Sequence, residues 1–183
     1  MKKYEFTGET KQVELSFGTV TLHRIKAVAE FGIVKVGDLG GWIEKEENLS
    51  HEEKAWVYGD AKVWGNAEVY GNAEVCGDAW IYGNAKVYGD AEVWGDAKVC
   101  GDADVFSISH VLVIGPIGSR NDFTTFFRDK DSEITVKCGC FIGKIDKFLE
   151  KVCETHGDSK YAIVYRTAVE IAKQQIDLSG EKQ

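Results

Sequence analysis

The sequence predicts a mainly β protein built around a repetitive solenoid, and three observations lead to that prediction. Nine consecutive six-residue units run from Ala55 to Ile108, beginning with AWVYGD and ending with ADVFSI, without a break in register. In each unit an Ala and a Val or Ile stand two positions apart, so both face one side of an extended segment. All but the last unit end in Gly followed by Asp or Asn, which tolerate the positive φ of a tight corner. Each unit therefore predicts one short strand and one turn that must stack on the next unit.

Three such units would close one three-sided coil of about 18 residues, so side chains about 18 positions apart should stack at the strand spacing of about 4.8 Å. The pattern Val-x-Gly-Asn/Asp-Ala-x resembles the hexapeptide repeat of left-handed β-helices. This resemblance implies the handedness, and the length of the repeat predicts about three to four coils.

The segment before the repeat is predicted to close one end of the solenoid. Residues 1–36 contain β-rich runs such as QVELSF and TVTLHRIKAV between Gly-containing turns, which indicates an N-terminal β cap. Residues 37–54 fit a degenerate capping coil, which extends the solenoid to 37–108. In that coil we expect Ile43 and Leu49 at the positions of the inward Ala, Asn48 at a corner, and His51 as a polar cap.

The hexad pattern ends at Ile108, and residues 109–183 predict a small α+β unit. The runs VLVIG, FTTFFRD and EITVKCGCF are typical of strands. A helix should follow with Ile145, Phe148, Leu149 and Val152 on one apolar face and Gly157 as its stop. A second helix should begin after Asp158 or Ser159. Its expected inward residues are Tyr161, Val164, Tyr165, Ala168, Ile171 and Ala172.

Composition narrows the classes of partner. The chain has 183 residues and a net charge of −8, and residues 55–108 carry −6 of it, from nine acidic residues and three lysines. Duplex binding depends on Lys and Arg, so we expect no direct nucleic-acid binding, although an acidic rod could occupy a basic groove meant for nucleic acid. No long apolar run or leader is present, which predicts no membrane contact. Five scattered cysteines fit a reducing, cytoplasmic location with neither metal nor cofactor.

Outward aromatic residues are expected on all three sides of the solenoid. Cross-strand pairing alone would account for them, but exposed apolar patches also mark interfaces. We expect self-association, with a trimer favoured because related hexapeptide-repeat proteins are commonly trimers. The expected interface residues are Tyr70, Tyr88, Phe106, Trp64, Tyr82 and Trp94. A corner column of Asp60, Asp78 and Asp96 would either be a solvated turn or, by mutual repulsion, raise its pKa values or attract a cation.

Any small-molecule site is expected in the C-terminal unit. The loop that contains Gly115, Gly118, Ser119 and Arg120 offers backbone N–H groups, a hydroxyl and a guanidinium, which suit an anion. Thr124, Thr125, Lys137 and His156 would complete it. The same loop can be an ordinary turn between strands. Cys140 and His156 could also form a nucleophile pair, but the sequence shows no third group to orient them.

The segments GDLGGWIEKEENLSHE, IGPIGSRNDFTTFF, KCGCF and ETHGD, together with the tandem units, resemble a family encoded by phages and prophages and labelled as hexapeptide-repeat or transferase-like. Acyltransferases with this repeat typically use a His as general base, yet residues 55–106 contain no His, Ser, Thr or Arg. We therefore expect no catalysis on the solenoid. The predicted function is a non-catalytic oligomeric binder of a host protein or a phosphorylated, nucleotide-like ligand, which in a phage setting would counter a bacterial defence system. The alternative is an acyltransferase-like enzyme acting on a small anionic substrate.

Overall fold

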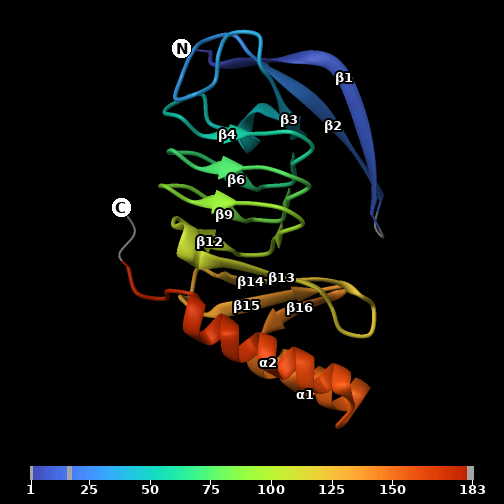
Figure 1. Ribbon diagram of the computed structural model, residues 1–183. Coiled ribbons are helices and arrows are strands. Elements are labelled where there is room, and N and C mark those ends of the chain that lie inside the picture. The colour runs from blue at the N-terminus through green and yellow to red at the C-terminus, as the bar shows by residue number, and fades with distance from the viewer. Residues whose placement is uncertain (1, 16–17, 181–183) are drawn as a thin grey trace.

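The computed structural model describes residues 2–15 and 18–180 and confirms the expected fold class. Its centre is a β-solenoid of stacked three-sided coils, seen upright in Figure 1. Each side of a regular coil is a strand of two residues, and stacked strands pair in parallel. The strands of the repeat are β4 (Trp56–Val57), β5 (Lys62–Val63), β6 (Glu68–Val69), β7 (Glu74–Val75), β8 (Trp80–Ile81), β9 (Lys86–Val87), β10 (Glu92–Val93), β11 (Lys98–Val99) and β12 (Asp104–Val105).

The predicted stacking of residues 18 positions apart is confirmed. Glu74, for example, pairs with Trp56 on one neighbouring coil and with Glu92 on the other. The Ala and Val or Ile side chains of the repeat are buried and form one continuous core. Gly77 shows what a corner requires, because its φ is 73° and a Cβ there would stand 2.9 Å from the backbone nitrogen of Gly95.

The capping coil differs from its expected register. Ile43 pairs with Val63, and Leu49 pairs with Val69, so both occupy Val positions and their expected placement at Ala positions is wrong. The reason is a longer corner between Leu49 and Trp56, which contains two more residues than the corresponding corner of the next coil. The hexad pattern cannot predict this insertion, because residues 50–54 do not follow it.

Asn48 was expected at a corner and instead lies buried at the end of the 3-10 turn η1 (Glu46–Asn48). Its side-chain amide donates hydrogen bonds to the carbonyl oxygens of Gly65 at 3.2 Å and Ala67 at 2.8 Å. In the regular coils backbone N–H groups make such bonds to the next coil. The Asn48 amide therefore replaces a backbone donor where the repeat becomes irregular.

The N-terminal cap is a long antiparallel hairpin of β1 (Tyr4–Leu15) and β2 (Gly18–Ala27). It continues through β3 (Leu39–Ile43) into one ladder of the solenoid, in the order β1-β2-β3-β5-β8-β11. Figure 1 shows the hairpin extending alongside the coils rather than only over their end. Val13 and Leu22 pack there against Trp42 and Trp64.

The C-terminal unit contains a four-stranded antiparallel sheet and two helices. The sheet has the order β13 (Val111–Ile117), β14 (Asp122–Arg128), β15 (Ile134–Cys138) and β16 (Phe141–Lys144). It follows the 3-10 turn η2 (Ile108–His110) and precedes α1 (Ile145–His156) and α2 (Lys160–Gln175). The segment EITVKCGCF, expected as one strand, bends at Gly139, whose φ is 56°, and supplies both β15 and β16.

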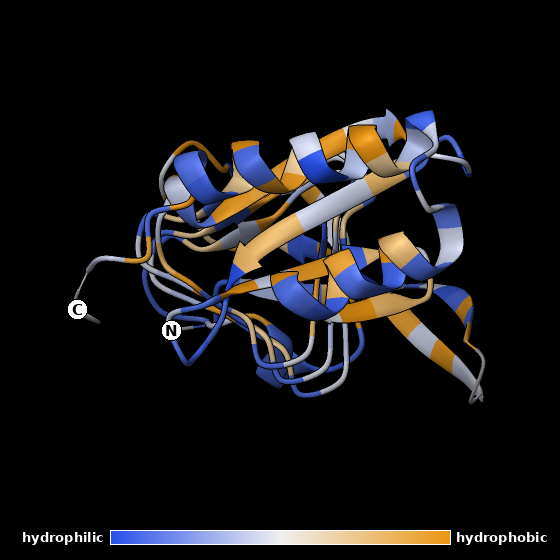
Figure 2. Ribbon diagram, turned by 90° about the horizontal axis from the view of Figure 1, so that it is seen from below, coloured by the Kyte–Doolittle hydropathy of each residue, from blue (hydrophilic) through white to orange (hydrophobic). Residues whose placement is uncertain are grey.

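The two faces of this sheet pack against different parts of the chain. Phe126 and Val136 contact the helices, which lie across one face in Figure 2. Phe127 joins the solenoid core, and the Thr125 hydroxyl accepts a hydrogen bond from the Lys98 N–H at 2.9 Å. The sheet is therefore a layer between the last coil and the helices.

The first helix confirms its predicted apolar face and its stop at Gly157, whose φ is 54°. In α2, which starts after Ser159, Tyr165, Ala168 and Ala172 are buried as expected. The expectation for Val164 and Ile171 is wrong, because both are exposed. Ala162 and Val169 are buried instead, so the buried face of α2 is rotated about the helix axis from the expected face and contains smaller side chains. No helix in the described part of the chain is long and apolar enough to cross a membrane.

Candidate functional site

The C-terminal unit contains a small cavity of about 220 Å³ that brings together three of the predicted ligand residues. Ser119 and Arg120 reach it from the loop between β13 and β14, and His156 reaches it from the end of α1. Cys140 enters from the turn between β15 and β16. The complete lining is Ser119, Arg120, Cys138, Cys140, Phe141, Phe148, Lys151, Val152, Thr155, His156 and Tyr165.

Two glycines place the Arg120 side chain. Gly118 has a φ of 72°, and a Cβ there would lie 1.9 Å from the Tyr165 hydroxyl, so the loop can approach the helix only with glycine at this position. Gly139 has a φ of 56°, and its Cβ would lie 2.5 Å from Nη1 of Arg120. The guanidinium therefore lies across the backbone of the turn between β15 and β16.

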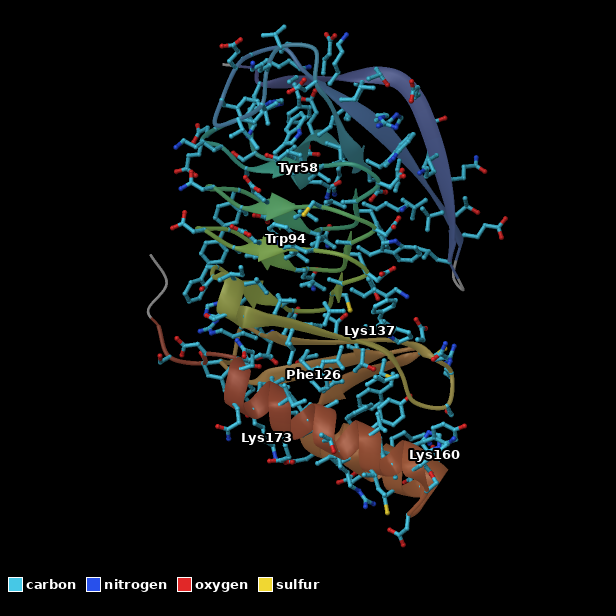
Figure 3. All side chains as sticks on the ribbon, in the orientation of Figure 1. Tyr58, Trp94, Phe126, Lys137, Lys160 and Lys173 are labelled. Atoms are coloured by element: carbon cyan, nitrogen blue, oxygen red, sulfur yellow. The ribbon has the colours of Figure 1, made fainter. Side chains whose placement is uncertain are left out.

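Several predicted ligand residues lie elsewhere. Thr124 is buried and donates a hydrogen bond to Sγ of Cys138 at 3.3 Å. The Lys137 ammonium donates to the carbonyl of Gly139 at 2.6 Å and lies on the solenoid side of the sheet, as Figure 3 shows. Gly115 packs closely against Phe123. Together with Thr125, which contacts Lys98, these residues are not part of the cavity.

Four further lining residues are not among the predicted ligand residues, namely Lys151, Thr155, Tyr165 and Cys138. Helical spacing could have identified the first two, because Lys151 and Thr155 lie three and seven positions after Phe148, which was predicted to face inward and also lines the cavity. Tyr165 was predicted only as a core residue. Cys138 pairs with Thr124 across the sheet and so lies on the helix side, and its position follows from strand alternation.

The cavity favours an anion. Among its described lining residues Arg120, Lys151 and His156 can carry positive charge, and none is acidic. Lys151 also pairs with Glu154 at 3.1 Å, but both groups are exposed, and a pair of this kind contributes little. Burial, followed by the nearby Cys138 thiol, raises the pKa of Tyr165 to about 12. Its hydroxyl therefore stays protonated near neutral pH and can donate a hydrogen bond.

The same cavity contains two thiols, Cys138 and Cys140. Cys140 and His156 both line it, yet no hydrogen bond joins them in the described chain. The Cys138 thiol accepts from Thr124 and contacts the Tyr165 hydroxyl at 3.9 Å. An activated nucleophile is typically hydrogen-bonded to a base that a third group orients, and the described residues show no such hydrogen bond between Cys140 and His156.

The histidines at the ends of the solenoid have structural partners. Nδ1 of His51 accepts a hydrogen bond from the Lys3 N–H at 3.2 Å, and its ring stacks on Tyr4 at 4.2 Å, so the expectation of a polar cap is confirmed. Nδ1 of His110 accepts from the Phe106 N–H at 3.2 Å. Burial lowers the pKa of both imidazoles. Neither side chain lines the C-terminal cavity.

The aromatic side chains expected at an oligomer interface differ in exposure. Trp94 is 56% exposed, and Tyr70, Tyr82 and Phe106 are half-buried. The expectation of outward exposure is wrong for Trp64 and Tyr88, which are buried within one chain. The hairpin covers Trp64, while Tyr88 lies between Tyr70 and Phe106, with ring centroids 4.8 and 5.4 Å away. Self-association itself stays a prediction.

In the corner column of aspartates, Asp60 contradicts the expectation of a raised pKa. Asp60 accepts hydrogen bonds from Lys11 at 2.9 Å and from the Trp42 indole at 3.2 Å, and these bonds lower its pKa rather than raise it. The hairpin, which the repeat pattern does not describe, supplies the lysine. Within residues 2–15 and 18–180, no group of three or more His, Cys, Asp or Glu side chains is placed to hold a metal ion.

The stacked coils define a hexapeptide-repeat β-solenoid protein. No protein-family model matches the chain. A protein of Escherichia coli K12 named "Uncharacterized acetyltransferase YdcK" is 34% identical over 62 residues, which are 32% of this chain and 19% of that protein. The matched part is thus less than a fifth of the relative's length. The similarity accords with a hexapeptide-repeat, transferase-like relationship.

Proposed function

We propose that this solenoid protein is a non-catalytic binding protein whose C-terminal unit holds a small phosphorylated ligand. The observation that carries the proposal is the convergence of Arg120, Lys151 and His156 on one cavity without an acidic lining residue. Arg120 supplies planar paired donors, and Ser119 and Tyr165 add hydroxyl donors, a set that suits phosphate oxygens. The solenoid serves as the rigid support on which this unit is carried.

Thermal unfolding in the presence of inorganic phosphate or ADP tests the proposal. A ligand that binds only the folded state raises its stability, and each kcal/mol should raise Tm by about 2–4 °C in a chain of this size. We expect a saturable rise in wild type that Arg120→Gln abolishes. Arg166→Gln is the matched control, because Arg166 is an exposed arginine of α2 outside the cavity. Sodium chloride at equal ionic strength separates binding from screening.

Two results would contradict this function. If the wild-type Tm in phosphate or ADP equals the Tm in sodium chloride, an anion site of useful affinity is excluded. An equal rise in wild type and Arg120→Gln would place the anion elsewhere. Either measurement requires only that both variants unfold cooperatively.

A second candidate function, an acyltransferase acting on a small anionic substrate, is favoured by the partial similarity to the protein named as an acetyltransferase. Because His51 and His110 have structural partners, His156 is the histidine of the cavity that could act as a general base. Acyl transfer from acetyl-CoA that His156→Ala abolishes would favour this enzyme over the binder. Phosphate-dependent stabilisation without acyl transfer would favour the binder.

The remaining expectations stay predictions. A phage or prophage origin, a role against a bacterial defence system and a homotrimer all come from the resemblance or from surface composition. Of the six proposed interface residues, Trp94 is the most exposed. It is therefore the first position to change in a test of self-association.

A further inference from the structure

A second and larger cleft, of about 780 Å³, lies along one side of the solenoid. The β1–β2 hairpin forms one wall of the cleft, and the hairpin of β15 and β16 forms the other. Ligand sites in proteins usually have about 300–1,000 Å³ and aromatic or apolar walls, so both size and lining fit. The lining is Leu15, Val20, Glu44, Trp64, Gly65, Trp80, Tyr82, Gly83, Lys98, Cys100, Gly101, Lys137, Gly139, Cys140 and Ile142.

The floor of the cleft is a cluster of flat rings. Trp64 and Tyr82 stack with ring centroids 4.7 Å apart and planes 2° apart. Trp80 meets Trp64 edge to face, with centroids 5.3 Å apart. Trp64 is covered, whereas Trp80 and Tyr82 are half-buried and still offer ring surface to a ligand. A planar aromatic molecule is the natural partner of such a floor.

Glycine corners keep the cleft open. Gly65, Gly83 and Gly101 stand one above another in successive coils, with φ values of 72°, 76° and 66°. Because glycine has no side chain, only backbone atoms line the cleft at this corner of the solenoid. Leu15 and Val20 of the hairpin rise on one side of it, and Ile142, which is 47% exposed, stands on the other.

The charges in the cleft favour an anionic group. Lys98 places its ammonium 5.4 Å from the centroid of the Trp80 ring, and Lys137 is fixed by its hydrogen bond to the Gly139 carbonyl. Glu44 is the acidic residue of the described lining, and its carboxylate accepts the Gly65 N–H at 2.7 Å. The described lining of the cleft therefore carries two ammonium groups against one carboxylate, although Lys98 also borders a neighbouring hollow lined by Asp78, Asp96 and Asp122.

We propose that this cleft binds a planar aromatic molecule that carries an anionic group. The ring stacks on Trp80 and Tyr82, and the anion pairs with Lys98 and Lys137. The cleft and the phosphate cavity adjoin at Cys140, which lines both, but they open on opposite sides of the sheet, because Lys137 lies on the solenoid side and Arg120 reaches the helix side. Binding here does not depend on the proposed function of the C-terminal cavity.

The probe for this site is 8-anilinonaphthalene-1-sulfonate, an aromatic molecule with a sulfonate. We expect saturable fluorescence enhancement in the folded protein, with energy transfer from tryptophan. Trp80→Leu should weaken the affinity about tenfold, because stacking and apolar contact are lost. Trp94→Leu is the matched control, because Trp94 lies on another side of the solenoid, outside the cleft. It should leave the affinity unchanged.

The double substitution Lys98→Gln with Lys137→Gln tests the anionic group and keeps the test valid if Trp80→Leu fails to fold. It should weaken binding of the sulfonate about threefold to tenfold and leave the uncharged probe N-phenyl-1-naphthylamine unaffected. Equal losses in Trp80→Leu and Trp94→Leu would place the probe elsewhere and overturn the site. Equal loss of both probes in the lysine variant, or no loss of either, would overturn the assigned ligand class.

Discussion

The two ends of the solenoid are closed by similar side chains with different electrostatic partners. At the end near the cap, the Lys3 ammonium is buried 4.8 Å from the centroid of the Phe31 ring. At the other end, the Arg128 guanidinium is buried 4.8 Å from the centroid of the Phe106 ring. Each end thus places a cation over an aromatic ring, where the stack of coils would otherwise expose its core.

The difference lies in what accepts the hydrogen bonds. Lys3 donates to two backbone carbonyls, those of Ala55 at 2.7 Å and Glu52 at 3.3 Å. Arg128 also donates to backbone carbonyls, those of Asp104 and Asp129, but in addition it donates to the buried carboxylate of Asp104 at 2.8 Å. Burial lowers the pKa of Lys3 to about 8, against the opposing effect of Glu53, whereas arginine keeps its charge at any ordinary pH. One end can therefore lose its charge as the pH rises through about 8, and the other cannot.

The largest effect is expected for Arg128→Met. The substitution removes the guanidinium from beside a carboxylate that is 5% exposed, and breaking a buried ion pair in this way costs about 3–5 kcal/mol. Urea unfolding followed by circular dichroism measures the loss.

Lys130→Met is the control, because it also removes one positive charge from an ion pair, but from an exposed one. Lys130 pairs with Asp102 at 2.7 Å, but both groups are well exposed, so the loss should be much smaller than for Arg128→Met. A loss for Arg128→Met no larger than for Lys130→Met would show that the buried pair does not hold this end closed.

The second effect, about 1–2 kcal/mol, is a pH dependence confined to the end that holds Lys3. The unfolded lysine has a pKa near 10.4, and the folded one near 8, so between these values the unfolded chain binds more protons. Stability should therefore rise from pH 7.5 to pH 9.5. Tyrosines and thiols with raised pKa values oppose this trend, so the measured quantity is the difference between wild type and Lys3→Met. Parallel curves for the two proteins would contradict a neutral amine at this site.

The regular part of the fold could be predicted because its signal repeats. Each hexad restates the same alternation of Ala and Val and the same Gly corner, so the register follows from any one of them. The hairpin was predicted only as a cap, because its long strands and its contact with Trp64 depend on distant residues. The longer corner after Leu49 was missed for a related reason, since a period describes repeats and not insertions.

The candidate site was predicted in part, and strand alternation explains the errors. Thr124 pairs with Cys138, and Thr125 pairs with Lys137, so these two pairs face opposite sides of the sheet. Lys137 therefore cannot join a cavity on the helix side. The convergence of Arg120 with His156 depends on where α1 packs, and local sequence patterns do not contain that information.

The smallest effect on stability is expected at acid pH, where the histidines at the two ends of the solenoid should destabilise the fold in the same way. Burial lowers the pKa of His51, although the nearby Glu46 carboxylate acts in the opposite direction. Burial and the Arg128 charge lower the pKa of His110, although Asp177 and Asp104 act in the opposite direction. Because the unfolded chain then binds each proton more readily, stability should fall as pH drops below about 6.5. Unfolding measured from pH 7.5 to pH 5.5 should show a shallower fall in His51→Gln and in His110→Gln than in wild type. If only one variant changed the slope, the equivalence of the two imidazoles would be wrong, and the ends would differ in acid as they do in base.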